Sequence, residues 1–534
     1  MLTVRVRTVL TVLAVLTSAM SAFAQSPNTA TIVVLVTDQT GAVVQDAKVS
    51  VANNQTGAVR EAVSGTDGSA TVSALSLTGS YTVTVSKQGF GDKDVKDLTL
   101  RGGETATLKV TLLVGTEKAD VTVYGTVEGV RADSQIGHRL DSATIDETPI
   151  LGRKVGTLPL FNSAFRQGKG TGDLFVNATY FVTASGSRRT TTFTLDGANN
   201  DEGWGRQTMI ATIPVGAIQE VSVLSNAFSA EFGFTSGPAL NIVTKSGTNA
   251  VHGEGLYMGR PGGWETKTLA TTGFCPPSVA SCVTPTTLTA INPADVPDVL
   301  HQFSGSFGAP LVKDKTFLFA TADYTRQDRT TFLSSTLPAF VLPADGSLTY
   351  TGHYQQVLFN GRVDHKFTPS QTLMVRTNVD RFYDTNPNDA VGGTSAPSVA
   401  RKYSRRSVTG QANLTSILGS NLVNEARMAY LDGDPVTLWE AQTLSTAYTR
   451  SGSVPFTIGQ SRLSDTFSRS AQLSDTLSWS HGMHTVRVGG SLVRHTSGGT
   501  GNEPGFAILG TFTFLSTTTA PFDQLTLANV QNYT

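Results

Sequence analysis

The second half of the chain alternates apolar and polar residues over long segments. In residues 359–367, the large apolar side chains fall on odd positions and most of the charged or amide side chains on even positions. A turn-like stretch at 368–371 follows, and the alternation resumes over 373–380. A period of two over about ten residues predicts strands with one apolar and one polar face. The same layout recurs at 408–414, 473–479 and 484–494.

The connections between these predicted strands differ in length. Three connections are long and polar, at residues 265–298, 333–351 and 385–401. The connections that alternate with them along the chain are short. A soluble sandwich also alternates, but short turns on one side and long loops on the other are typical of outer-membrane barrels. We therefore expect residues 250–534 to supply antiparallel transmembrane β-barrel strands.

A compact unit precedes the predicted barrel. Residues 190–195, 219–224 and 240–244 read as short strands, and Asp196–Gly197 marks a turn after the first of them. The segments IPVGAIQEVSV, SAEFG and LNIVTKSGTN follow one another here, with LDG upstream and AVHGEGLY downstream. This order resembles the plug of TonB-dependent outer-membrane receptors, in particular their Oar-like branch. The resemblance implies that residues 127–249 form a small α/β plug inside the barrel.

The resemblance continues into the barrel. HQFSGSFGAPLVKDKTFLFATADY, at residues 301–324, is similar to the Oar-like barrel. Family barrels have about 22 strands around a plugged lumen, and residues 250–534 would supply roughly half of them. We therefore expect a fragment or a truncated product with an incomplete barrel. Because unpaired strand edges are costly in lipid, we expect that it does not insert stably alone.

A separate β-domain is predicted at the N-terminal side of the plug. Alternating Val and Thr with regularly spaced turns predicts a small antiparallel sandwich over residues 29–114. The segments DQTGAVVQDAKVSV, TDGSATVSAL and GSYTVTVSKQGF resemble the carboxypeptidase regulatory-like domain, which we assign to residues 25–115. The resemblance implies a transthyretin-like sandwich without catalytic residues. Some members are linked to carbohydrate binding, and a periplasmic spacer is the alternative.

Residues 1–24 have the pattern of a signal peptide. Arg5 and Arg7 precede an apolar core at 9–16, and Ala22–Phe23–Ala24 forms an A-x-A cleavage site. The sequence therefore predicts export, with the barrel in the outer membrane and the N-terminal domains in the periplasm or the barrel lumen.

Residues 116–126 link the sandwich to the plug and contain the sequence EKADVTVYGT. This segment can pair as one extended strand. In the resembled family such a segment, the TonB box, adds to a sheet edge of the energy transducer TonB, with main-chain hydrogen bonds as the main source of affinity. A linker or a first plug strand is the alternative interpretation. The candidate TonB contacts are Asp120, Val121, Thr122, Val123 and Tyr124.

Composition narrows the functional classes. The net charge of −1 gives no basic surface for nucleic acid. No motif of a hydrolase, nucleotide-binding loop or metalloprotease is present, so we expect neither an enzyme nor a cofactor or metal site. Cys275 and Cys282 are the two cysteines. Export favours a small loop disulfide between them, with two free thiols as the alternative.

The loop LDGANNDEGW supplies candidate ligand-binding residues at the plug apex. An acidic group beside an aromatic ring could hold a sugar or a cation, whereas turn formation is the structural alternative. Arg188 and Arg189 are expected to contact the polar inner wall of the barrel. The candidate ligand residues are Asp196, Asn199, Asp201, Glu202 and Trp204.

The resemblance implies a TonB-dependent receptor for energised uptake of an unidentified solute. Its expected partners are a TonB-type transducer and outer-membrane lipid. The alternative is a non-energised barrel for surface binding or adhesion.

Overall fold

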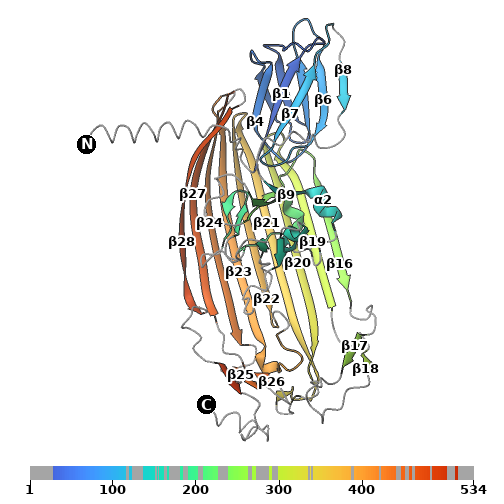
Figure 1. The fold of residues 1–534 in the computed structure, drawn as a ribbon, viewed down its shortest axis with the longest axis vertical. Coiled ribbons are helices and arrows are strands. Elements are labelled where there is room, and N and C mark those ends of the chain that lie inside the picture. The colour runs from blue at the N-terminus through green and yellow to red at the C-terminus, as the bar shows by residue number, and fades with distance from the viewer. Residues whose placement is uncertain are drawn as a thin grey trace, which may run out of the picture.

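The computed structural model of the chain describes three structured parts joined in sequence. The residues it describes are 28–115, 119–122, 136–148, 150, 153, 155–161, 165–167, 181–183, 191–201, 209–226, 238–261, 268–271, 288–291, 299–334, 337, 341–386, 390–419, 422–439, 447–450, 456–459, 464–481, 484–501 and 511–514. The predicted signal peptide lies outside these residues. Figure 1 shows a β-domain at one end of a tall, curved sheet, with the shorter elements of the plug lying against the sheet.

The N-terminal domain is a sandwich of two sheets. One sheet has the order β4 (Ser69–Leu75), β1 (Ala30–Thr37), β7 (Thr105–Thr111). The other has the order β3 (Val59–Val63), β2 (Lys48–Asn53), β5 (Tyr81–Ser86), β6 (Lys93–Leu98), β8 (Ala119–Thr122). The predicted sandwich is confirmed, but it is not fully antiparallel, because the β1–β7 and β6–β8 pairs are parallel.

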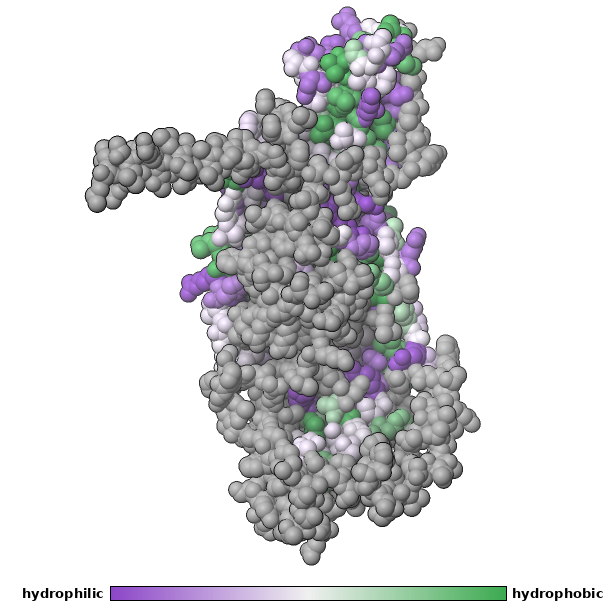
Figure 2. Space-filling model, viewed as in Figure 1, coloured by the Kyte–Doolittle hydropathy of each residue, from purple (hydrophilic) through white to green (hydrophobic). Residues whose placement is uncertain are grey.

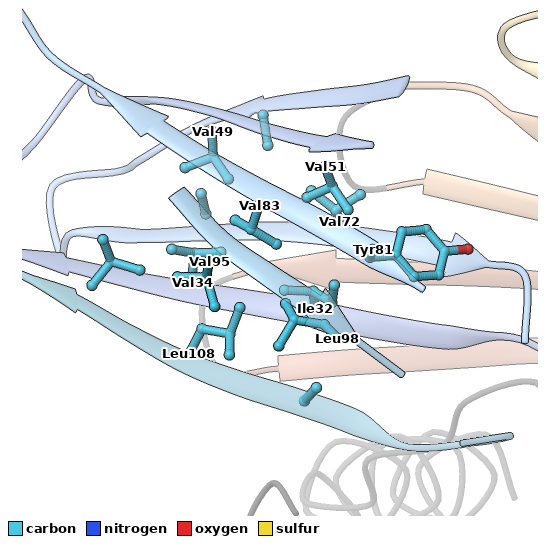
Figure 3. Close-up of a cluster of buried hydrophobic side chains, with 14 of the residues drawn as sticks. Ile32, Val34, Val49, Val51, Val72, Tyr81, Val83, Val95, Leu98 and Leu108 are labelled. Carbon is cyan, nitrogen blue, oxygen red and sulfur yellow. The ribbon is translucent and has the colours of Figure 1, made fainter. Parts of the chain in front are cut away.

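The sandwich core comes from the alternation that the sequence displays. Val34, Val49 and Val83 are fully buried, and each lies on the inner face of its strand (Figure 3). The neighbouring positions face solvent, where hydrophobic and hydrophilic residues are interspersed (Figure 2). Burial raises the pKa of Tyr81 to about 12, and its hydroxyl donates to the Ser76 carbonyl at 2.8 Å.

The plug is built on a five-stranded sheet. Its order is β13 (Ala198–Asn199), β12 (Thr192–Leu195), β15 (Ala239–Thr244), β14 (Ile218–Asn226), β9 (Ile136–Asp141), with β12 and β15 parallel. The Asp141 carboxylate caps the helix α2 (Ser142–Glu147) by accepting from the Thr144 amide at 2.8 Å, and Ile145 of this helix enters the core. The remaining plug elements are η2 (Val155–Phe161), β10 (Phe165–Gln167), β11 (Phe181–Thr183) and η3 (Val215–Ala217).

Nine antiparallel strands form the tall sheet. In order they are β16 (His252–Arg260), β19 (Val299–Val312), β20 (Thr316–Phe332), β21 (Thr349–Thr368), β22 (Gln371–Asp384), β23 (Arg401–Ile417), β24 (Leu422–Trp439), β27 (Ser464–His481) and β28 (His484–Gly501). Short turns join them at the end near the sandwich, and long connections join them at the other end (Figure 1). These connections contain β17 (Thr268–Thr271), β18 (Leu288–Ile291), η8 (Pro397–Val399), β25 (Ala447–Arg450) and β26 (Phe456–Ile458), and β29 (Thr511–Phe514) follows β28.

The two faces of this sheet have opposite character. Phe359 and Val375 are 38% and 46% exposed on the convex face, whereas Asn360 and Asn378 are fully buried on the concave face. The concave face receives the plug, so the convex face is the lipid-facing one. The barrel-type alternation is therefore confirmed. Within the described residues, no helix combines the length and the apolar character needed to cross a bilayer.

Candidate functional site

A buried ion pair joins the turn after β12 to the barrel wall. Asp196 has a positive φ of 48° and is 2% exposed. Its carboxylate accepts from the Thr244 amide at 2.8 Å and from the Thr244 hydroxyl at 2.9 Å. From the wall, Arg376 Nε lies 2.8 Å from Asp196 Oδ2, and Arg362 Nη1 donates to the Thr244 carbonyl at 2.7 Å. This carboxylate thus connects two plug strands to two barrel arginines.

A second contact holds the loop between β13 and η3. The Asp380 carboxylate, on β22, accepts from the Thr212 amide at 3.1 Å, from Arg405 Nη2 at 2.6 Å and from Gln356 Nε2 at 3.0 Å. Asp380 and Arg405 are at most 1% exposed. Burial of a charged pair costs free energy unless each charge has such partners. Asp380 and Arg405 hold the segment Ile210–Thr212. We use the name loop clamp for these two side chains together with that segment.

Other wall side chains complete the loop clamp. Asn378 donates to the Thr212 carbonyl at 3.1 Å, and the Ser407 hydroxyl donates to the Ile210 carbonyl at 2.7 Å. Ile210 and Ala211 also pack on Leu431, which is the small apolar part of this interface. The wall therefore binds the loop mainly through hydrogen bonds to its backbone.

A third contact lies at the β12–β13 turn. Arg427 donates to the Gly197 carbonyl at 3.1 Å, and Gln472 accepts from the Asn199 amide at 2.8 Å. Gly197 has a φ of 73°, and a Cβ there would lie 2.9 Å from the Arg427 guanidinium. A glycine is needed here for both conformation and space. The turn predicted at Asp196–Gly197 thus lies directly against the wall.

The structure brings together only some of the candidate ligand residues. Asp201 is 3% exposed and its carboxylate accepts from the Phe193 amide and the Thr192 hydroxyl, at 2.6 and 3.0 Å. Like Asp196, it is occupied by protein donors, which favours the turn-forming role that the sequence analysis left open. Glu202, Trp204, Arg188, Arg189, Cys275, Cys282, Val123 and Tyr124 lie outside the described residues.

Sequence reasoning did not single out the wall residues that contact the plug. Arg362, Arg376 and Asp380 each occupy the polar, even-numbered face of a strand that the alternation had predicted. Their even-numbered positions are the sequence signal that could have identified them as plug contacts, because an arginine that faces a barrel lumen needs a hydrogen-bond acceptor there. Some acceptors come from the plug, namely Thr244 and Asp196, and others are neighbouring wall residues, namely Asp364 and Gln411.

The sandwich is docked on the rim of the wall and on the plug. The Asn249 amide donates to the Gln55 carbonyl at 2.9 Å, and Lys366 donates to the Thr56 carbonyl at 3.1 Å. On the plug side, the Gly102 amide donates to the Glu220 carboxylate at 2.9 Å. The sandwich therefore covers part of the plug at the end of the barrel that carries the short turns.

The Glu220 contact makes this docking dependent on pH. Burial raises the pKa of Glu220, and the nearby Arg139 guanidinium and the Gly102 amide oppose that shift. A raised pKa in the docked state means that docking takes up a proton, so docking is strongest below the ordinary pKa of a glutamate and weakens as pH rises through the raised value. We expect hydrogen exchange at the Gly102 amide to accelerate over this range beyond the intrinsic rate. The variant Glu220→Gln should remove that excess, and an unchanged pH profile in the variant would contradict the assignment.

The described part of the candidate TonB contact segment lies in the edge strand β8 (Ala119–Thr122) of the sandwich. Its backbone pairs in parallel with β6, from Lys93 opposite Ala119 to Lys96 opposite Thr122. One edge of β8 is thus paired and, as the last strand in the order of its sheet, β8 presents its other edge outward. The segment forms a strand, as expected, and it joins the sandwich rather than the plug sheet.

Comparison with known proteins agrees with this architecture. Residues 31–113 match the family of carboxypeptidase regulatory-like domains, and residues 243–356 and 342–534 match the family of outer membrane beta barrel domains. The second match extends over more than half of the chain. The chain belongs to this outer-membrane β-barrel family, and its barrel lies in the outer membrane.

The chain is also similar to individual transport proteins. It is 26% identical to the TonB-dependent transporter Oar of Myxococcus xanthus over 266 residues, which is 48% of this chain and 23% of the relative. Among solved structures, the outer membrane transporter YddB of Escherichia coli has a TM-score of 0.48 at 12% identity and covers 68% of this chain and 48% of its own. A mutant of the ferric enterobactin receptor PfeA of Pseudomonas aeruginosa has a TM-score of 0.44 at 11% identity and covers 67% of this chain and 49% of its own. The chain spans about half of these solved proteins, and less of the curated relative.

Proposed function

We propose that this protein is a TonB-dependent receptor that moves a solute across the outer membrane past its plug. The observation that carries the proposal is the chemistry of the plug–wall interface. The plug is held by charged groups and backbone hydrogen bonds, such as those of Asp196 and of the loop clamp, and by few apolar contacts. Water can replace polar partners when such an interface opens, whereas an opened apolar core would expose its surface at a much higher cost.

Energy for opening would enter through β8. A partner strand can bind this segment in two ways: it can extend the sandwich sheet at the outer edge of β8, or it can displace β6 and free the segment. Only the second way transfers a pull from the partner to the connection between β8 and the plug, because a docked β8 stays fixed to the sandwich. We therefore propose that energised uptake requires release of β8 from β6.

A disulfide across this strand pair tests the energising step. We expect the pair Lys96→Cys/Thr122→Cys, in a background with Cys275→Ser and Cys282→Ser, to block uptake when oxidised and to restore it on reduction. The two positions are direct register partners. The matched control is Lys48→Cys/Val63→Cys, which joins β2 and β3 at the far edge of the same sheet. Uptake that persists with β8 locked would show that release is not needed.

A non-energised barrel for surface binding or adhesion is the second candidate function. The docked sandwich and the paired β8 support it, since both fix the segment that a transducer would have to reach. Val121→Pro removes a main-chain donor from β8, so it should abolish energised uptake and leave surface binding unchanged. The plug-apex residues, the Arg188–Arg189 contact and carbohydrate binding by the sandwich stay predictions.

A further inference from the structure

The lipid-facing surface of the wall carries a groove and, nearer the long loops, a group of arginines. The groove has a volume of about 650 Å³ and spans five strands, from β22 to β28. Leu373, Leu414, Ala426, Asp475 and Gly490, which are successive cross-strand partners, form its row nearest the short turns.

The next row towards the long loops completes the groove. Ala412, Met428, Leu473 and Leu492 are again successive partners, and Met428, Leu473 and Leu492 are 59%, 57% and 71% exposed. The small side chain of Ala412 makes the surface recede between large, exposed ones. Asp475 is the acidic residue in the groove, and it accepts a hydrogen bond from Asn424 at 2.8 Å. The shape and apolar lining fit hydrocarbon chains.

The arginines begin immediately beyond the groove, towards the long loops. Arg494 follows Leu492 by two positions on β28, and Arg469 precedes Leu473 by four on β27. At about 3.3 Å per residue, these guanidinium-bearing positions lie about 7 and 13 Å from the groove along the strands. Two more arginines, Arg381 and Arg406, are direct cross-strand partners on β22 and β23. We call these four residues the outer arginine cluster.

The charges in this cluster do not balance within the protein. Asp432 lies 2.8 Å from Arg469 and 3.4 Å from Arg406, and Asp434 is the register partner of Arg406. Asp465 lies four positions before Arg469 on the same face of β27, so three carboxylates accompany the four guanidinium groups. Among the described residues, Arg381 and Arg494 make no ion pair. Like charges directly opposite one another on a sheet, as at Arg381 and Arg406, are destabilising without an anion between them.

We propose that this surface is a binding site for a phosphate-bearing lipid of the outer leaflet. The groove would hold its hydrocarbon chains and the outer arginine cluster its phosphate. Short turns mark the periplasmic side of such barrels, and the cluster lies towards the opposite, long-loop side. Planar guanidinium groups match phosphate geometry and hold it by charge-assisted hydrogen bonds. The proposal concerns the outer wall and does not depend on transport.

Lipid titration of the detergent-solubilised protein tests the site, with lipid A as the probe and native mass spectrometry as the readout. We expect Arg406→Gln to weaken binding of phosphorylated lipid A about tenfold, the loss typical of one charge-assisted hydrogen bond. Arg326→Gln is the matched control, because Arg326 is also outward-facing on β20, with a side chain 53% exposed against 57% for Arg406. The control should bind as the unmodified protein does.

A second variant tests the groove without touching a charge. A Cβ at Gly490 meets no atom within 4 Å, so Gly490→Leu fills the groove without a clash. We expect it to weaken binding by a similar factor, whereas Gly255→Leu, an equally open site on β16, should have no effect. Lipid A stripped of its phosphates should bind at least tenfold more weakly than the intact probe. Equal binding of both probes, or binding unchanged in Arg406→Gln and Gly490→Leu, would overturn the proposal.

Discussion

Asp196→Ala is expected to destabilise the plug by about 3–5 kcal/mol, the usual cost of removing one partner from a buried ion pair. The substitution leaves the Arg376 guanidinium, which is 2% exposed, without its carboxylate 2.8 Å away. It also removes the acceptor of the Thr244 amide. Hydrogen exchange at the backbone amide of residue 196 measures the effect, because that amide donates to the Ile242 carbonyl of β15 at 2.8 Å and becomes free to exchange only when the turn after β12 leaves β15.

A double-mutant cycle separates the pair from the rest of the interface. Arg376→Met alone leaves the Asp196 carboxylate with the two Thr244 hydrogen bonds and the more distant Arg362, 3.9 Å away, so we expect a smaller loss. The double variant Asp196→Ala/Arg376→Met should lose less than the sum of the two single variants, because neither charge is then buried alone. Losses below about 1 kcal/mol in both single variants would be typical of a solvated pair. They would show that this contact does not fix the plug.

The sequence predicted most of the fold because its signals are local. Alternation over residues 359–367 and 373–380 defines both faces of β21 and β22 without any knowledge of their neighbours. Local signals are weak at the edge strand β3. Val59 and Val63 of this edge strand are 50% and 61% exposed, so their apolar character does not mark a buried face. The charged Glu61, paired with Lys48 on β2, lies between them.

The functional interface could be predicted only in part, because its partners are distant in the chain. The parity of Arg362 and Arg376 shows that they face the lumen. Nothing near them in sequence shows which acceptor they meet, since Arg362 and Thr244 are 118 residues apart. The parallel pairing of β1 with β7 could not be predicted for the same reason, because the alternation within a strand does not indicate the direction of a partner that is distant in the chain. The arginines expected between plug and wall, Arg188 and Arg189, belong to the plug. Arg362, Arg376 and Arg427 instead contact the plug from the wall.

Arg405→Met is expected to loosen the loop clamp by a comparable amount, about 3–5 kcal/mol, since it leaves Asp380 buried without its cation. Arg405 also stacks on Phe382, 4.8 Å from the ring centroid, and methionine retains part of that packing. The effect should appear as faster hydrogen exchange at Ile210, whose amide bonds to the Asn200 carbonyl inside the loop. Exchange at Thr244, in the other contact, should change little, because sites without shared partners behave additively.

The clamp variant distinguishes a gate from a fixed plug. If the loop between β13 and η3 must leave the wall before a solute passes, then Arg405→Met, introduced into a chain long enough to close the barrel, makes opening less costly and raises passive leakage of a small solute into proteoliposomes. Asp380→Asn/Arg405→Met removes both charges together, keeps an acceptor for the Thr212 amide, and should restore most of the resistance to leakage. Faster exchange at Ile210 with no rise in leakage would place the pathway elsewhere along the wall, since the loop would then have opened without opening a passage.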